Sequence, residues 1–268
     1  MRALLVVLAA CSAYDPIAEV PHGSRELPDT QTAIATILAE NPTPRVYAIG
    51  EYHQTEKAIA KTSPLARFTR EIVDLLEPSA RHLVVEAWLD AACWAKPDYQ
   101  ALTQRPGTTQ MEILRLVRRS QQMRLDAHGL PMTCIEHSAL RGDNVLLLLE
   151  TITDKLHETV DGLLADDPDH AVIVYGGALH NDLYPRWPLD ELSYAKPLAA
   201  ELGSGGVLEI DLVVPEVVAN MQMVRDEPWF PLLGRASPSR VIVWERGPSS
   251  YVVILPAQSE AVAAIAKL

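Results

Sequence analysis

Short apolar runs alternate with amphipathic stretches along most of the chain. The clearest runs cover residues 46–49, 83–87, 132–135, 171–175 and 207–214. Their length and their polar boundaries are typical of buried strands. Between them, apolar residues recur at helical spacing. This order predicts an α/β fold in which helices cover a mostly parallel sheet.

The helices predicted between these runs begin at residues that cap helices well. Asp29 precedes a helix that continues to about Glu40, and Ser63 precedes a second helix with proline at its first position. Asp143 precedes the longest helix, whose apolar residues form one face through Leu163. These capping residues therefore support the helices that the apolar periodicity predicts.

Two segments depart from this alternation. Residues 93–130 are longer than a normal crossover and contain a polar helix from about Thr109, so we predict a small helical insertion there. Residues 240–244 and 251–255 flank a Gly-Pro pair, which predicts an antiparallel hairpin. The expected fold is a three-layer α/β domain: a mostly parallel sheet, helices on both faces, the insertion and a C-terminal hairpin.

The first residues are typical of an export signal. Arg2 precedes a short apolar run that ends at Cys11. The sequence LAAC at this point resembles the bacterial lipobox, whose cysteine is lipidated and becomes the mature N-terminus. The run is far shorter than the roughly 20 residues of a membrane span, so acyl chains would form the anchor. A buried first strand is the alternative interpretation.

This interpretation divides the chain into a signal peptide at 1–11, a proline-containing tether at 12–28 and one domain at 29–268. Ser12 follows the lipobox cysteine. By resemblance to enterobacterial sorting, this residue favours a lipid-anchored protein of the bacterial cell envelope, in the outer membrane and facing the periplasm. Cys93 and Cys134 would then meet an oxidising compartment, where they either pair or remain separate thiols.

Composition limits the classes of partner. The 268 residues carry a formal charge of −12, which leaves no basic surface for nucleic acid. The arginines within residues 115–124 are spaced as the solvated face of one helix. A monomer and a homodimer are both compatible with these features.

Reactive side chains gather where the predicted strands end. Glu51 and His53 follow the first strand, Glu86 ends the second, and His180 follows the fourth. The carboxyl ends of parallel strands meet at one edge of a sheet, so these groups are expected to share a site. The period of two in an extended chain places Glu51 and His53 on one side and Tyr52 on the other.

Each of these residues also has a structural alternative, such as a surface histidine, a buried acid bonded to backbone donors or a helix cap. A glutamate that ends an apolar strand is costly to bury without a cation, histidine or metal beside it, which favours a functional role for Glu86. Weaker candidates are Glu136 and His137 after the third predicted strand, Glu209 and Asp211 on the fifth, and His82 and His157, for which a structural role is favoured.

These motifs together resemble the Tiki superfamily. The matching segments are Gly50–His53, Glu86, the RGDN sequence at 141–144 and Gly177–His180, in order over roughly residues 29–255. The superfamily groups the ChaN haem-binding lipoproteins, the TraB and Tiki metal-dependent peptidases and the erythromycin esterases. The form Gly-Glu-x-His with a lipobox is more similar to ChaN, although ChaN-like chains often have Asp-Asn after the histidine, where Gln and Thr stand here.

The ChaN-like resemblance implies a haem-binding protein of iron uptake. Tyr52, His53 or His180 would then bind the haem iron, and Arg141 would pair with a propionate. The motif form and the predicted anchor favour this hypothesis. It gives no role to the two glutamates.

The Tiki and TraB branches imply a hydrolase of peptides or esters in the same pocket. His53, His180 and Glu51 would hold a divalent metal such as Mn, Co or Zn, or would activate water directly. Glu86 would serve as general base, and Arg141 would stabilise the developing oxyanion. Residue chemistry favours this alternative because every group has a role.

Overall fold

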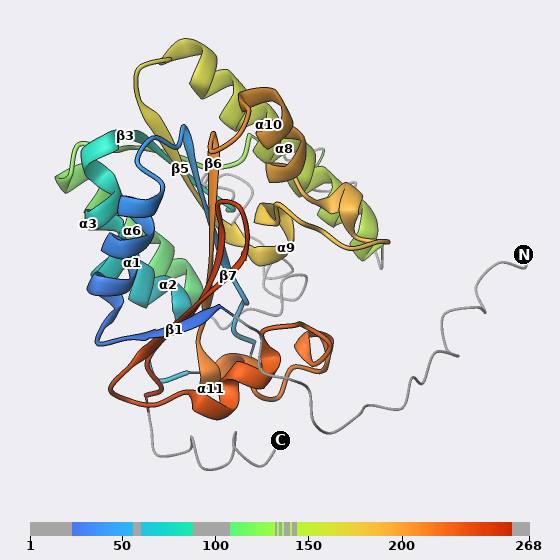
Figure 1. The fold of residues 1–268 in the computed structure, drawn as a ribbon. Helices are drawn as coiled ribbons and strands as arrows, with labels where there is room; N and C mark the ends of the chain where they lie inside the picture. The colour runs from blue at the N-terminus through green and yellow to red at the C-terminus, as the bar shows by residue number, and fades with distance from the viewer. Residues whose placement is uncertain are drawn as a thin grey trace, which may run out of the picture.

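The computed structural model describes residues 23–55, 60–87, 108–131, 133, 136, 140 and 144–258. Its centre is an eight-stranded sheet in the order β1-β7-β8-β6-β2-β5-β3-β4 (Figure 1). The strands are β1 (Ser24–Leu27), β2 (Val46–Glu51), β3 (Ala80–Val85), β4 (Asp126–His128), β5 (Ala171–Gly177), β6 (Val207–Val213), β7 (Val241–Gly247) and β8 (Ser250–Ile254).

Most of the sheet is parallel. β2 pairs in parallel with β5 and β6, β3 with β4 and β5, and β8 with β6. β7 runs antiparallel to both β1 and β8. The predicted C-terminal hairpin is therefore confirmed, and its second strand continues the parallel part of the sheet.

Helices cover both faces of the sheet (Figure 1). One face carries α1 (Thr30–Glu40), α2 (Pro64–Arg67), the π-helix η1 (Phe68–Ile72), α3 (Val73–Leu76) and α6 (Thr109–Gln122). The other carries α8 (Val145–Asp166) and α10 (Ala195–Leu202), with α9 (Ala178–Asn181) directly after β5. The predicted three-layer α/β fold is confirmed.

The remaining described helices are short turns. Those outside the two main layers are η2 (Glu77–Ser79), η3 (Asp190–Leu192), α11 (Pro215–Val218), η4 (Gln222–Val224) and η5 (Phe230–Arg235). The segment from α11 to η5 packs its apolar residues, including Trp229, against β7, β8 and the end of β6. These residues form the third apolar cluster, and Tyr52, directly after β2, packs against it.

Two predicted helix caps are confirmed. Asp29 accepts a hydrogen bond from the backbone N–H of Thr32 at 2.7 Å, and Ser63 accepts one from Ala66 at 2.9 Å. The cap of α8 is Asn144 and not Asp143, because Asn144 accepts the hydrogen bond that begins the helix. Such caps satisfy backbone donors that the first helical turn leaves unpaired.

The edge strands differ from the prediction. β1 lies within the predicted tether, so Ser24–Leu27 belong to the sheet. β4 lies within the predicted insertion, while Thr133, in the predicted third strand, belongs to no strand. Both edge strands are short, polar and only partly buried, so neither has the apolar pattern on which the prediction rests.

Some predicted features lie outside the described residues. These are the signal segment with Cys11, the first part of the tether, residues 93–107 of the insertion, both Cys93 and Cys134, and the segment 141–143. Within the described ranges, no helix is both long and apolar enough to cross a membrane.

Candidate active site

Three of the predicted groups meet at the carboxyl end of the sheet. Glu51 is the last residue of β2, and Glu86 directly follows β3. The Nδ1 atom of His53 lies 2.7 Å from Oε1 of Glu51, and its Nε2 atom lies 3.6 Å from Oε1 of Glu86. As the period of two predicts, Glu51 and His53 lie on the same side. We call this group the Glu51–His53–Glu86 cluster.

Neighbours on β5 hold both carboxylates in place. The hydroxyl of Tyr175 donates a hydrogen bond to Oε2 of Glu51, and the backbone N–H of Gly177 donates one to Oε2 of Glu86. The two carboxylates are 5% and 9% exposed. Burial strengthens such hydrogen bonds, so both carboxylates are held in fixed orientations. The imidazole of His53 lies between them.

Two glycines make room for carboxylates at this edge. A Cβ atom on Gly176 would lie 2.7 Å from Oε2 of Glu86, and one on Gly50 would lie 2.0 Å from Oδ1 of Asp211. Real side chains do not approach this closely. At Gly50 the backbone Cα of Ala178 would also lie only 2.9 Å away, so glycine is required there, whereas a side chain at Gly176 would displace the Glu86 carboxylate.

Tyr52 points away from the cluster. Its ring packs against Trp229 with centroids 5.3 Å apart, next to the third apolar cluster. Burial, followed by the charges of Asp211 and Glu227, raises the pKa of its phenol well above the ordinary value. The phenol is thus protonated at neutral pH and packs as part of the core beside β2.

His180 is buried on α9, on the face of the sheet that α8 covers. Its Nδ1 atom lies 2.9 Å from the Thr153 hydroxyl and 3.0 Å from the carbonyl oxygen of Leu192. These contacts tie α9 to α8 and to η3. Any ligand of His180 would therefore have to use Nε2.

Glu112 on α6 is a site residue that the sequence did not indicate. It lines a small hollow with Glu51 and His53, and the Ser63 hydroxyl donates a hydrogen bond to its Oε2 atom at 2.7 Å. Burial raises the pKa of Glu112, the Ser63 hydrogen bond lowers it, and the Glu51 charge raises it further. The sequence shows only a glutamate on a polar helix, with no motif around it.

We expect Glu112→Gln to stabilise the protein at pH 7.5 and to have little effect at pH 4. The raised pKa means that the folded state disfavours ionised Glu112, so this cost is absent below the ordinary pKa of 4.5 and grows as the pH rises through the folded pKa. A glutamine oxygen can still accept from Ser63. Thermal unfolding at both pH values measures the difference.

The control for this measurement is Glu150→Gln, which changes an exposed glutamate of α8. We expect its melting temperature to match the wild type at both pH values. A loss of stability for Glu112→Gln at pH 7.5, or a gain that is larger at pH 4, would contradict the burial of a charged carboxyl at this position.

The hollows at the cluster are small. One is lined by Glu51, His53, Gln54, Ser63, Pro64, Leu65, Thr109 and Glu112, and the other by Glu51, His53, Leu65, Val85, Glu86, Ile113, Tyr175 and Gly176. As bounded by the described residues, one has a volume of about 10 Å³ and the other of about 0 Å³. Ligand pockets typically measure about 300–1,000 Å³. The described part of the site has room for about one water beside His53.

Glu209 and Asp211 do not join the cluster. They lie two residues apart on β6, and both face the side of the sheet opposite the cluster. There Arg246 of β7 contacts Glu209 and lies 2.7 Å from Asp182. Burial, followed by the Glu209 charge, raises the pKa of Asp211 well above its ordinary value. Burial alone lowers the pKa of Arg246, but Glu209, Asp211 and Asp182 raise it. This buried charged group is separate from the candidate active site.

The remaining predicted residues are dispersed or lie outside the described ranges. Glu136 is exposed and hydrogen-bonds to Thr133, whereas His137 and Arg141 are outside the described residues. Across the described ranges, no three histidine, cysteine, aspartate or glutamate side chains are grouped so as to hold a metal ion. Metal binding by Glu51, His53 and His180 stays a prediction.

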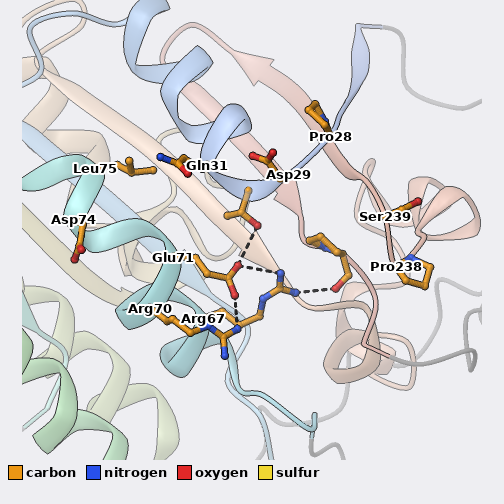
Figure 2. Close-up of a pocket in the computed structure, with 12 residues that line it drawn as sticks. Pro28, Asp29, Gln31, Arg67, Arg70, Glu71, Asp74, Leu75, Pro238 and Ser239 are labelled. Carbon is orange, nitrogen blue, oxygen red and sulfur yellow. Dashed lines mark hydrogen bonds and ion pairs between the residues drawn. The ribbon is translucent and has the colours of Figure 1, made fainter.

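A larger cavity of about 570 Å³ lies elsewhere, between α1, η1 and the segment around Pro238 (Figure 2). Glu71 lies at its wall and accepts hydrogen bonds from Arg67, Arg70 and Thr30. Among the described residues that line this cavity there is no histidine or cysteine. The Glu51–His53–Glu86 cluster is therefore the stronger candidate for chemistry.

No protein-family model and no curated protein matches this chain. Among solved structures, the type III effector HopBA1 is similar, with 15% sequence identity and a TM-score of 0.45. That match covers 92% of this chain and 100% of the other chain.

Proposed function

We propose that the protein is a hydrolase of esters or amides in which His53 activates water. The observation that carries this proposal is the position of the imidazole between two buried carboxylates, 2.7 Å from Glu51 and 3.6 Å from Glu86. A histidine oriented by a carboxylate through one ring nitrogen is the usual arrangement for a general base.

In this mechanism Glu51 accepts the Nδ1–H of His53 and fixes the tautomer that presents Nε2. The Nε2 atom takes a proton from water as the water attacks the carbonyl carbon. The imidazolium that forms is stabilised by Glu51 and Glu86, and it then gives its proton to the leaving alcohol or amine. The hydrogen bonds from Tyr175 and Gly177 keep both carboxylates in position throughout.

The test is hydrolysis of p-nitrophenyl esters and fluorogenic peptide amides by the purified full-length chain. We expect turnover by the wild type and a loss of at least about 10²-fold in His53→Ala, the size of effect typical of an acid–base group. The matched control is His157→Ala on α8, which contacts Glu201 and lies outside the site. Equal turnover in His53→Ala and the wild type would contradict the proposal.

The same assay with a chelator separates the direct and metal-dependent forms of the hydrolase. Direct activation of water by His53 predicts unchanged turnover in chelator. Loss of turnover that a divalent metal restores would instead support the ligand set of His53, His180 and Glu51.

Haem binding and iron uptake stay a prediction from the motif form. No cavity of haem size adjoins His53 within the described residues, and Tyr52 packs against Trp229. A haem titration followed by visible absorbance tests it directly. A saturable Soret shift that is lost in His53→Ala, His180→Ala or Tyr52→Phe would favour the haem-binding protein over the hydrolase.

We also propose that the chain is exported and anchored by lipid at Cys11. The support is the short apolar run after Arg2 and the lipobox-like LAAC sequence. Membrane fractionation tests this: we expect the wild type in the membrane fraction and Cys11→Ser in the soluble fraction. A Cys11→Ser protein that still sediments with membranes would contradict lipidation.

A further inference from the structure

A pair of histidines lies near the start of β3, away from the candidate active site. The register of β3 and β4 pairs His82 with Asp126 and Val84 with His128. Residues two apart in a strand face the same side, so His82 and His128 are diagonal neighbours on one face. The Nδ1 atom of His82 lies 3.1 Å from Nε2 of His128. Glu86 lies four residues further along the chain from His82, about 13 Å in an extended strand.

A carboxylate lies behind the first of these rings. Asp167 caps the end of α8, and its Oδ2 atom is 3.4 Å from Nε2 of His82. Asp167 also accepts a hydrogen bond from Nδ1 of His170 at 2.8 Å. The Nε2 atom of His82 is buried and makes no hydrogen bond to any described residue.

The facing nitrogens, 3.1 Å apart, are close to the spacing of two ligands on one metal ion. Zinc–nitrogen bonds of about 2.0–2.1 Å in a tetrahedral site place two ligand nitrogens about 3.3–3.4 Å apart. A carboxylate that accepts from the second nitrogen of a ligating histidine is the usual device that orients the ring, and Asp167 lies within ion-pair distance of that nitrogen, 3.4 Å away.

We propose that His82 and His128 bind a divalent transition-metal ion such as Zn²⁺, through Nδ1 of His82 and Nε2 of His128, with Asp167 as the positioning residue behind His82. The two rings supply half of a tetrahedral coordination sphere. Water or a group from another molecule would fill the other positions, consistent with the absence of a three-residue ligand group among the described residues. The His82 side chain is 12% exposed, so an ion can reach the pair from solvent.

This site is independent of the proposed hydrolase. It uses different side chains near the opposite end of β3, and its failure would leave the Glu51–His53–Glu86 cluster unchanged. A structural hydrogen bond between the two imidazoles is the competing explanation of the 3.1 Å contact. That explanation predicts a loss of stability in the variants but no metal binding by the wild type.

The experiment is a calorimetric titration of the purified full-length chain with Zn²⁺ at pH 7.5. We expect a saturable site whose affinity falls at least tenfold in His82→Ala and in His128→Ala. Asp167→Asn should weaken it about tenfold, as loss of a carboxylate behind a ligand does. The control His157→Ala should bind as the wild type does.

Two outcomes would overturn the proposal: no saturable Zn²⁺ binding by the wild type, or wild-type affinity in both histidine variants. Circular dichroism checks that each variant is folded. If an alanine variant does not fold, His128→Gln replaces it, since glutamine keeps a hydrogen-bonding group near His82 but is a poor zinc ligand. Zn²⁺ should then raise the melting temperature of the wild type and not that of His128→Gln.

Discussion

Glu51→Gln is expected to lower the rate of hydrolysis by about 10³- to 10⁴-fold while the protein remains folded. Glutamine has nearly the same shape, and Tyr175 can still donate to its oxygen. However, a neutral amide does not stabilise the imidazolium, and its NH₂ group can turn toward Nδ1 and favour the wrong tautomer of His53. The measurement is kcat and KM on whichever ester or amide substrate the wild type hydrolyses.

Tyr175→Phe provides the matched comparison. It removes one hydrogen bond to Glu51 and leaves the carboxylate itself in contact with His53. We expect a loss of about tenfold, the equivalent of roughly 1–1.5 kcal/mol for one hydrogen bond. If Glu51→Gln were no slower than Tyr175→Phe, the charge of Glu51 would have no part in the reaction and the proposed role would be wrong.

Arg246→Met is expected to lower the free energy of unfolding by about 3–5 kcal/mol. Arg246 is the cation that contacts Glu209, which is fully buried, and it lies 2.7 Å from Asp182. Methionine fills similar space, but it leaves Glu209 and Asp182 without their cationic partner, next to the buried Asp211. Urea unfolding at pH 7.5 measures the loss.

Arg240→Met is the control, because Arg240 pairs with Glu26 at the surface and its side chain is 62% exposed. Exposed pairs contribute up to about 1 kcal/mol, so we expect a small change. The double variant Arg246→Met/Glu209→Gln should recover part of the stability, since it removes a buried charge. Equal losses for Arg246→Met and Arg240→Met would mean that the buried pair is not a net source of stability.

The centre of the fold could be predicted from the sequence, whereas the edges could not. β5 is buried along its whole length and its apolar run is visible in the sequence. β6 is equally buried, and its apolar residues alternate with Glu209 and Asp211. β1 and β4 are short edge strands whose polar residues have no such pattern. β1 pairs with β7, far along the chain, and β4 pairs with β3 across a long connection. A local sequence pattern does not reveal either pairing.

The candidate site was predictable where chemistry coincides with strand ends. Glu51, His53 and Glu86 follow buried runs, and that position alone brings them to one edge. Tyr175 was missed because a tyrosine inside an apolar run is indistinguishable from a core residue. Glu112 was missed because it reaches the site from α6, outside the repeating pattern of strand and helix.

The placement of β1 has a consequence for biosynthesis. β1 pairs with β7, so Ser24 lies beside Trp244 although more than 200 residues separate them in sequence. A ribosome adds residues from the N-terminus, at about 5–20 residues per second, so β1 is made many seconds before its partner exists. The central parallel strands can pair before β7 is made, and β1 docks last. β7 joins the sheet only through β8, so translation through residues 250–254 is the step that allows β1 to enter the sheet.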